Sequence, residues 1–134
     1  MLTRRQLLAV SASIEWGAGV GFAITPSLMA SLIVGGSLDT PAATTVGRVA
    51  GAALFCLGTA CWLTRDHGRN PVTALVIAML IYNIAAAAIL VTAATVSNMT
   101  GIGLWPTVVL HLGMAAWCLA SLLSTPESLP AEGR

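Results

Sequence analysis

The side chains best suited to chemistry in this chain stand within long apolar stretches. One acid, one guanidinium, one imidazole and a neighbouring phenol and amide interrupt these stretches: Glu15, Arg48, His111, Tyr82 and Asn83. An ionisable group among hydrocarbon costs several kcal/mol unless it is paired or hydrated, so such a group is a candidate for a functional role. We therefore treat these five residues as one candidate polar cluster inside a membrane.

Helix geometry predicts that these side chains share one depth. At a rise of about 1.5 Å per residue, Glu15 lies about 15 Å and Asn83 about 18 Å from one membrane edge. His111, counted from the opposite edge of a core roughly 30 Å thick, lies about 21 Å from that same edge. Arg48 begins near the far edge, and we expect its long side chain to point inward. The sequence predicts an interior ion pair between Glu15 and Arg48, extended by hydrogen bonds from Tyr82, Asn83 or His111.

Three roles fit this cluster. A buried ion pair can fix helix register without doing chemistry. A second form of this structural role is that Arg48 reaches the outer surface and meets Asp39 there. In the second role the cluster binds a ligand or handles a proton. Catalysis has the weakest case, because the sequence has no G-x-S-x-G, H-E-x-x-H or phosphate-binding glycine loop. We expect no enzyme activity, no cofactor and no metal ion, since one intramembrane His and one Glu are too few ligands.

Four apolar stretches must position these residues. They cover about 6–25, 46–63, 72–96 and 104–123 of a single domain, 1–125, and a polar cytoplasmic tail follows at 126–134. Each is close to the roughly 20 residues that cross a bilayer. The composition agrees, because only 8% of residues are charged and 57% are hydrophobic, whereas a soluble domain has about 25% charged residues. The sequence predicts an all-α bundle of four transmembrane helices.

The first loop and the glycines carry further expectations. Pro26 marks a helix end, and Ser27–Val34 is expected to form a short helix at the outer membrane interface, with one long kinked helix as the alternative. Glycines four residues apart allow close helix packing in membranes. Two such pairs occur, Gly17 with Gly21 and Gly47 with Gly51.

Arginine placement predicts the orientation. With four spans, five arginines fall on one side and Arg48 alone on the other; the five are Arg4, Arg5, Arg65, Arg69 and Arg134. Positive loops mark the cytoplasmic face, so both termini are expected in the cytoplasm (N-in/C-in) of a multi-pass cytoplasmic (inner) membrane protein. The expected partners are the lipid bilayer and either further copies of the chain or a larger membrane complex. A net charge of +1 without a clustered basic face gives no case for nucleic acid.

Short motifs resemble those of the small bacterial four-helix membrane proteins called DoxX-like. The resembling segments are 26–28 (Pro-Ser-Leu), 47–54 (Gly-Arg-Val-Ala-Gly-Ala-Ala-Leu), 82–83 (Tyr-Asn) and 111–112 (His-Leu). Many members have no assigned activity, so this resemblance implies architecture more than function.

A second resemblance is to the small multidrug resistance transporters, which have four helices and a glutamate midway along the first. It implies that Glu15 exchanges protons for a cationic substrate. The chain departs from that pattern because it has few aromatic residues, an Arg48 that would repel a cation, and a strong arginine bias.

Together these features predict a small integral membrane protein whose polar site binds a small amphipathic ligand or only stabilises the bundle. The alternatives are a proton-coupled transporter and an accessory subunit of a larger membrane complex.

Overall fold

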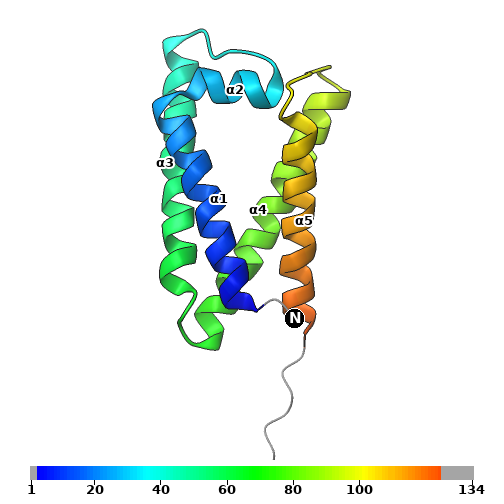
Figure 1. The fold of residues 1–134 in the computed structure, drawn as a ribbon. Coiled ribbons are helices and arrows are strands. Elements are labelled where there is room, and N and C mark those ends of the chain that lie inside the picture. The colour runs from blue at the N-terminus through cyan, green and yellow to red at the C-terminus, as the bar shows by residue number, and fades with distance from the viewer. Residues whose placement is uncertain (1–2, 125–134) are drawn as a thin grey trace, which may run out of the picture.

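The computed structural model describes residues 3–124, and this part of the chain is all helical, without strands. Five helices follow one another: α1 (Arg4–Ile24), α2 (Pro26–Val34), α3 (Pro41–Thr64), α4 (Arg69–Thr95) and α5 (Leu104–Leu123) (Figure 1). All but α2 are long and apolar enough to cross a membrane, with mean hydropathies between 1.5 and 2.5. The four predicted stretches are thus confirmed as helices, while the predicted tail at 126–134 lies outside the described residues.

Local capping fixes where the first helices begin. The Thr3 hydroxyl accepts a hydrogen bond from the Gln6 amide and the Gln6 side chain accepts one from the Thr3 amide, which together form a capping box. Thr40 likewise accepts from the amide of Ala43 at 3.1 Å. Proline is favoured in the first helical turn, so α3 begins at Pro41. The predicted start near 46 was late, because it followed the apolar run and overlooked this cap.

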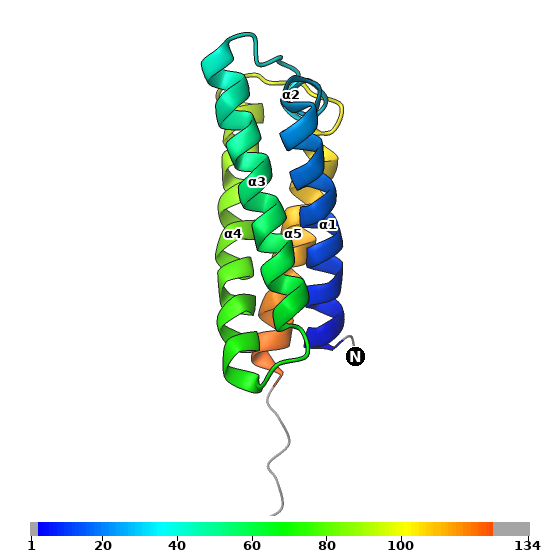
Figure 2. The same cartoon turned by 90° about the vertical axis from the view of Figure 1, so that its left-hand side faces the viewer.

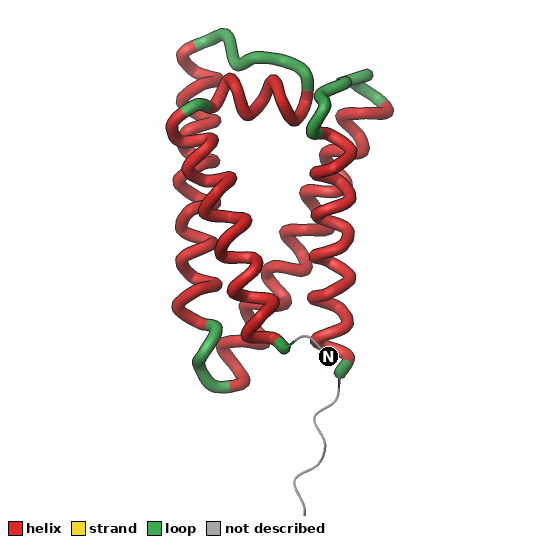
Figure 3. Tube along the Cα trace, viewed as in Figure 1, coloured by secondary structure: helices red, strands yellow, loops and turns green. Residues whose placement is uncertain are grey.

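The short helix after Pro26 is confirmed as a separate element, one residue longer than expected, and the chain does not form the single kinked helix of the alternative. Helix α2 turns away from α1 and crosses one end of the bundle (Figures 1 and 3). Gly35 ends it in the left-handed region, at φ 80°. The amide of Gly103 then donates to the carbonyl of Leu32 at 2.7 Å, which fastens α2 to the start of α5.

The long helices associate as two close pairs, α1 with α3 and α4 with α5 (Figure 1). Figure 2 shows α1 and α3 in front of α4 and α5. Glycine permits the first pairing, because a Cβ on Gly51 would lie 2.7 Å from the carbonyl oxygen of Gly19. The prediction that Gly17 belongs to a close-packing face with Gly21 is wrong, since a Cβ on Gly17 would meet nothing within 4 Å. The contact face of α1 is therefore displaced by two residues from the predicted one.

The two pairs meet in an apolar core near the described chain ends. This core comprises Leu7, Leu8, Ala12, Cys61, Val72, Val76, Met79, Met114 and Cys118. Beside it, the Arg4 guanidinium donates to the carbonyl of Ser121 at 2.9 and 3.1 Å and to the hydroxyl of Thr73 at 2.8 Å. Arg4 thereby joins α1 to α4 and α5 at this end. Toward α2 the two pairs separate, and α2 bridges between them (Figure 1).

Candidate functional site

Glu15 is buried between three helices. Only 3% of its surface is exposed, and the hydroxyl of Tyr82 on α4 donates to its Oε2 at 3.4 Å. On the α3 side stands Gly58, where an added Cβ would lie 3.2 Å from the Glu15 Cβ. The missing side chain of Gly58 thus makes room for the acid, and the long hydrogen bond to Tyr82 leaves it weakly held.

Asn83 and His111 form the second half of the site. The Asn83 side-chain amide donates to the carbonyl of Met79 at 2.7 Å, and its Oδ1 lies 2.8 Å from Nδ1 of His111. The His111 ring meets the Tyr82 ring edge-on, with centroids 5.6 Å apart. The structure therefore brings together four of the five predicted residues, from α1, α4 and α5.

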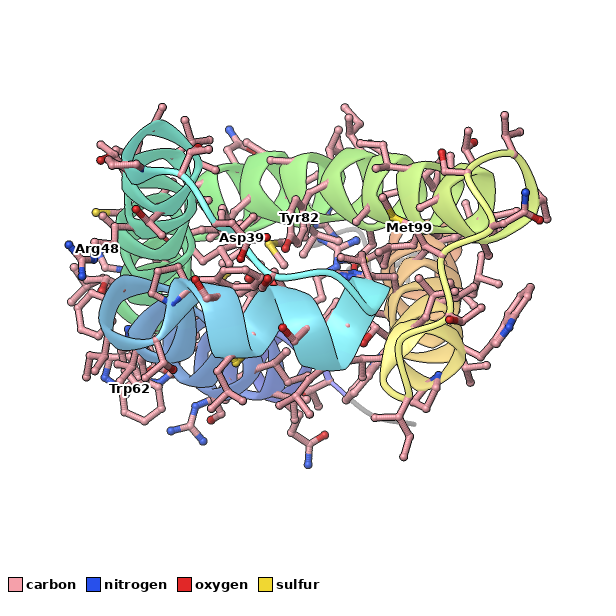
Figure 4. All side chains as sticks on the ribbon, turned by 90° about the horizontal axis from the view of Figure 1, so that it is seen from above. Asp39, Arg48, Trp62, Tyr82 and Met99 are labelled. Atoms are coloured by element: carbon pink, nitrogen blue, oxygen red, sulfur yellow. The ribbon has the colours of Figure 1, made fainter. Side chains whose placement is uncertain are left out.

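The predicted ion pair between Glu15 and Arg48 is wrong. Arg48 is exposed and points outward from α3 in the view from above (Figure 4). The salt bridges found within residues 3–124 join Asp66 to Arg5 and to Arg65. Within residues 3–124, Arg48 forms no salt bridge with Asp39 either. The Asp39 carboxylate instead accepts a hydrogen bond from the Ser37 hydroxyl.

The antiparallel register of α1 and α3 explains this correction. Gly58 is the α3 residue beside Glu15, and Gly47 is the one beside Pro26. Arg48 is ten residues from Gly58, or about 15 Å along the helix axis. Inward snorkelling cannot cover that distance through packed helices, so Arg48 belongs to the α2 end of the molecule.

A cavity of about 380 Å³ adjoins Glu15, Tyr82 and His111. Its other walls are mainly apolar and come from α1, α2, α3 and α5, including Met29 and Leu54. A second cavity of about 370 Å³ lies against α2 and α4 and is almost wholly apolar. The two share four lining residues, Phe22, Ile33, Thr107 and His111. The two cavities are therefore neighbours, and Glu15 and Tyr82 line only the first of them.

Sequence reasoning missed Thr107 and the α2 side chains that line this space. Ile33 and Met29 look like ordinary membrane-facing residues, and Thr107 sits in an apolar run. The turn at Pro26 was the signal that could have predicted them. A helix that crosses the end of the bundle must cover the space between the long helices.

The remaining titratable residues do not build a second centre. In the described part of the chain, no group of three or more His, Cys, Asp and Glu side chains is placed to hold a metal ion. Cys61 and Cys118 are buried free thiols, whereas Cys56 is exposed on a different side of α3 from Cys61.

Four helices with the length and composition of membrane spans, a crossing α2 and an off-centre polar cluster define a small, all-helical chain of multi-pass membrane type. No family model matches the chain, and neither a curated protein nor a solved structure does so. The likenesses to DoxX-like proteins and to small multidrug resistance transporters therefore stay hypotheses.

Proposed function

We propose that this multi-pass membrane protein binds a small amphipathic ligand in the cavity beside Glu15. The observation that carries the proposal is a contrast across two neighbouring cavities. Glu15 and Tyr82 line the first cavity, Thr107 and His111 line both, and the other lining residues are apolar. Small-molecule sites are typically apolar hollows of roughly 300–1,000 Å³ with a few convergent polar groups. A ligand with a polar head and an apolar tail satisfies both parts.

A purely structural role explains the cluster less well. Buried polar groups that only stabilise a fold are usually fully hydrogen-bonded. Asn83 and His111 fit that description through their 2.8 Å contact. The Glu15 carboxyl does not, because within residues 3–124 its one side-chain hydrogen bond is the 3.4 Å contact from Tyr82.

Photolabelling tests this proposal. The protein in nanodiscs is irradiated with a decyl chain that bears a diazirine and, in turn, a hydroxyl, an ammonium or a methyl ester head, and labelled residues are mapped by mass spectrometry. We expect at least one probe to label Phe22 and Ile33, which line the cavities, more strongly than Val109, which is 68% exposed. Equal labelling of all three residues by every probe would refute ligand binding here.

Two glycine variants control the labelling. Gly17 lines the larger cavity, and an added Cβ there meets nothing within 4 Å. Gly17→Leu should therefore fill the cavity and remove the excess labelling without disturbing the fold. Gly113 is equally unobstructed but lines neither cavity, so Gly113→Leu should leave the labelling unchanged.

Proton-coupled transport of an amphipathic cation is the second candidate, and the position of Arg48 favours it. Arg48 is remote from Glu15, so the repulsion that counted against a bound cation is removed. In vesicles, the ammonium probe should then release protons in a manner that Glu15→Gln abolishes while folding is retained. Proton release that persists in Glu15→Gln would eliminate transport and leave ligand binding standing.

The proposed orientation places the arginine-rich end in the cytoplasm and α2 at the outer interface of the inner membrane. The start of α1, the end of α3 and the start of α4 lie at the end of the bundle opposite α2 (Figure 1). These helix ends carry or adjoin Arg4, Arg5, Arg65 and Arg69, and cytoplasmic loops are enriched in such residues. Helix α2 exposes Leu28 and Leu32, as an interfacial helix does.

Cysteine labelling tests this orientation. In a variant whose three native cysteines are replaced by alanine, Asp39→Cys should react with an impermeant maleimide applied to intact cells. Asp66→Cys should react only after the cells are lysed, because it lies at the opposite end. The reverse pattern would show that the chain is inserted the other way.

A further inference from the structure

We infer that the ligand is a single-tailed amphiphile whose head group donates hydrogen bonds, a hydroxyl or an ammonium. The reason is that the polar side chains lining the cavities have already given their hydrogens to the protein and present acceptors to the cavity. This inference rests on the proposed function, since it specifies the chemistry of the molecule bound there.

The first step is the orientation of Asn83, which is 2% exposed. One end of its side chain lies 2.7 Å from the carbonyl oxygen of Met79. A carbonyl oxygen only accepts hydrogen bonds, so that end of Asn83 must be the NH₂ group. The other end, 2.8 Å from His111, is consequently the oxygen Oδ1.

The second step is the proton position on His111. Oδ1 of Asn83 only accepts, so Nδ1 of His111 must carry the hydrogen that it donates. In the neutral ring the other nitrogen, Nε2, then has no hydrogen and acts as an acceptor. Nε2 has no hydrogen-bond partner within residues 3–124 and is not among the fully enclosed unpartnered atoms there. It is available to a molecule in the cavities that His111 lines.

The third step extends the count to every polar side chain lining the cavities, namely Glu15, Tyr82, Thr107 and His111. The Tyr82 hydroxyl donates its hydrogen to Glu15, and the Thr107 hydroxyl donates its own to the carbonyl of Gly103 at 2.7 Å. The groups left for a ligand are lone pairs on Nε2 of His111, on both hydroxyl oxygens and on the Glu15 carboxyl. Even a protonated Glu15 would add one hydrogen against several acceptors.

The apolar cavity supplies the place for the tail. It contains no polar side chain except Thr107 and His111, and these stand at its junction with the larger cavity. A head group hydrogen-bonded to Nε2 of His111 therefore leaves a tail directed between α2 and α4, against Ile89 and Leu90.

Competition between head groups tests the inference. Unlabelled 1-decanol, decylamine and methyl decanoate share a tail length and are compared as competitors of the photoprobe that labels Phe22. We expect decanol, decylamine or both to compete at about tenfold lower concentration than methyl decanoate, as one hydrogen bond allows. Preference for decanol identifies a hydroxyl at Nε2 of His111, and preference for decylamine identifies an ammonium at Glu15.

Variants at His111 separate this explanation from general damage. His111→Phe keeps an aromatic ring beside Tyr82 but removes the acceptor, so it should erase a preference for decanol while the ester still competes. A preference for decylamine, which depends on Glu15, should persist in this variant. Leu112→Phe, on an exposed neighbour that lines neither cavity, should keep the preference. Equal competition by all three compounds in the unmodified protein would overturn the inference and leave the proposed function intact. If none of the probes labels the cavity residues, the proposed function itself is refuted.

Nitrogen NMR gives a second, ligand-free test. The chain has two histidines, His67 and His111, so His111→Phe assigns their signals. We expect His111 to be neutral and protonated at Nδ1, and Asn83→Leu to abolish that preference, whereas Asn83→Asp, which keeps an acceptor, should preserve it. A proton on Nε2, or on both nitrogens, would overturn the inference.

Discussion

Gly51→Ala is expected to lower the free energy of unfolding by about 3 kcal/mol, the cost of overfilling a tightly packed contact. The added methyl group would lie 2.7 Å from the carbonyl oxygen of Gly19 and 2.9 Å from the carbonyl carbon of Phe22. These neighbours are backbone atoms, which cannot rotate away as a side chain can. Helices α1 and α3 must therefore move apart along the whole contact that places Glu15 beside Gly58.

Gly17→Ala on the facing helix is the matched control. It makes the same chemical change in a membrane span, but the new methyl group meets nothing within 4 Å. Its effect should stay within about 1 kcal/mol, the difference in helix propensity between the two residues. Unfolding in mixed micelles, followed by circular dichroism, measures both variants. Equal losses for Gly51→Ala and Gly17→Ala would show that α1 and α3 do not pack through Gly51.

This contrast between two glycines also marks how far the sequence could lead. Span number and approximate length follow from apolar runs, because a bilayer sets the length that each helix needs. Which face of α1 meets α3 does not follow, since Gly17, Gly19 and Gly21 offer two alternative faces of small residues. Only the packed pair shows that Gly19 makes the contact.

The site divides in the same way. Glu15, Asn83 and His111 could be placed near one depth from residue counts, and their grouping confirms that this reasoning works along a helix axis. The same reasoning failed for Arg48. The direction and reach of its side chain depend on the register of α3 against α1, which the sequence does not give.

The cavity was beyond prediction for another reason. It exists because the helix pairs meet at the Leu7 and Leu8 end and are held apart at the other end by α2. No residue type encodes such a divergence of the two pairs. It depends on how the α1–α3 contact, the α4–α5 contact and the contacts of α2 combine.

Gly101→Ala is expected to have the largest effect on ligand binding among variants that do not line the cavity. A Cβ there would press on the backbone of Ile33 and lie 2.7 Å from the amide nitrogen of Gly35. The end of α2 would have to leave the loop between α4 and α5. Cavity labelling of Phe22 should fall about tenfold, a change of roughly 1.4 kcal/mol in binding, because Ile33 and Met29 on α2 form part of the cavity wall.

Gly36→Ala is the control for this variant. It lies one residue beyond Gly35, where an added Cβ meets nothing within 4 Å, so labelling should be unchanged. Global stability should fall less in Gly101→Ala than in Gly51→Ala, because α2 has only 9 residues and the apolar core at the opposite end stays intact. Full labelling in Gly101→Ala would show that α2 does not hold the cavity in shape, and binding would then depend on the four long helices alone.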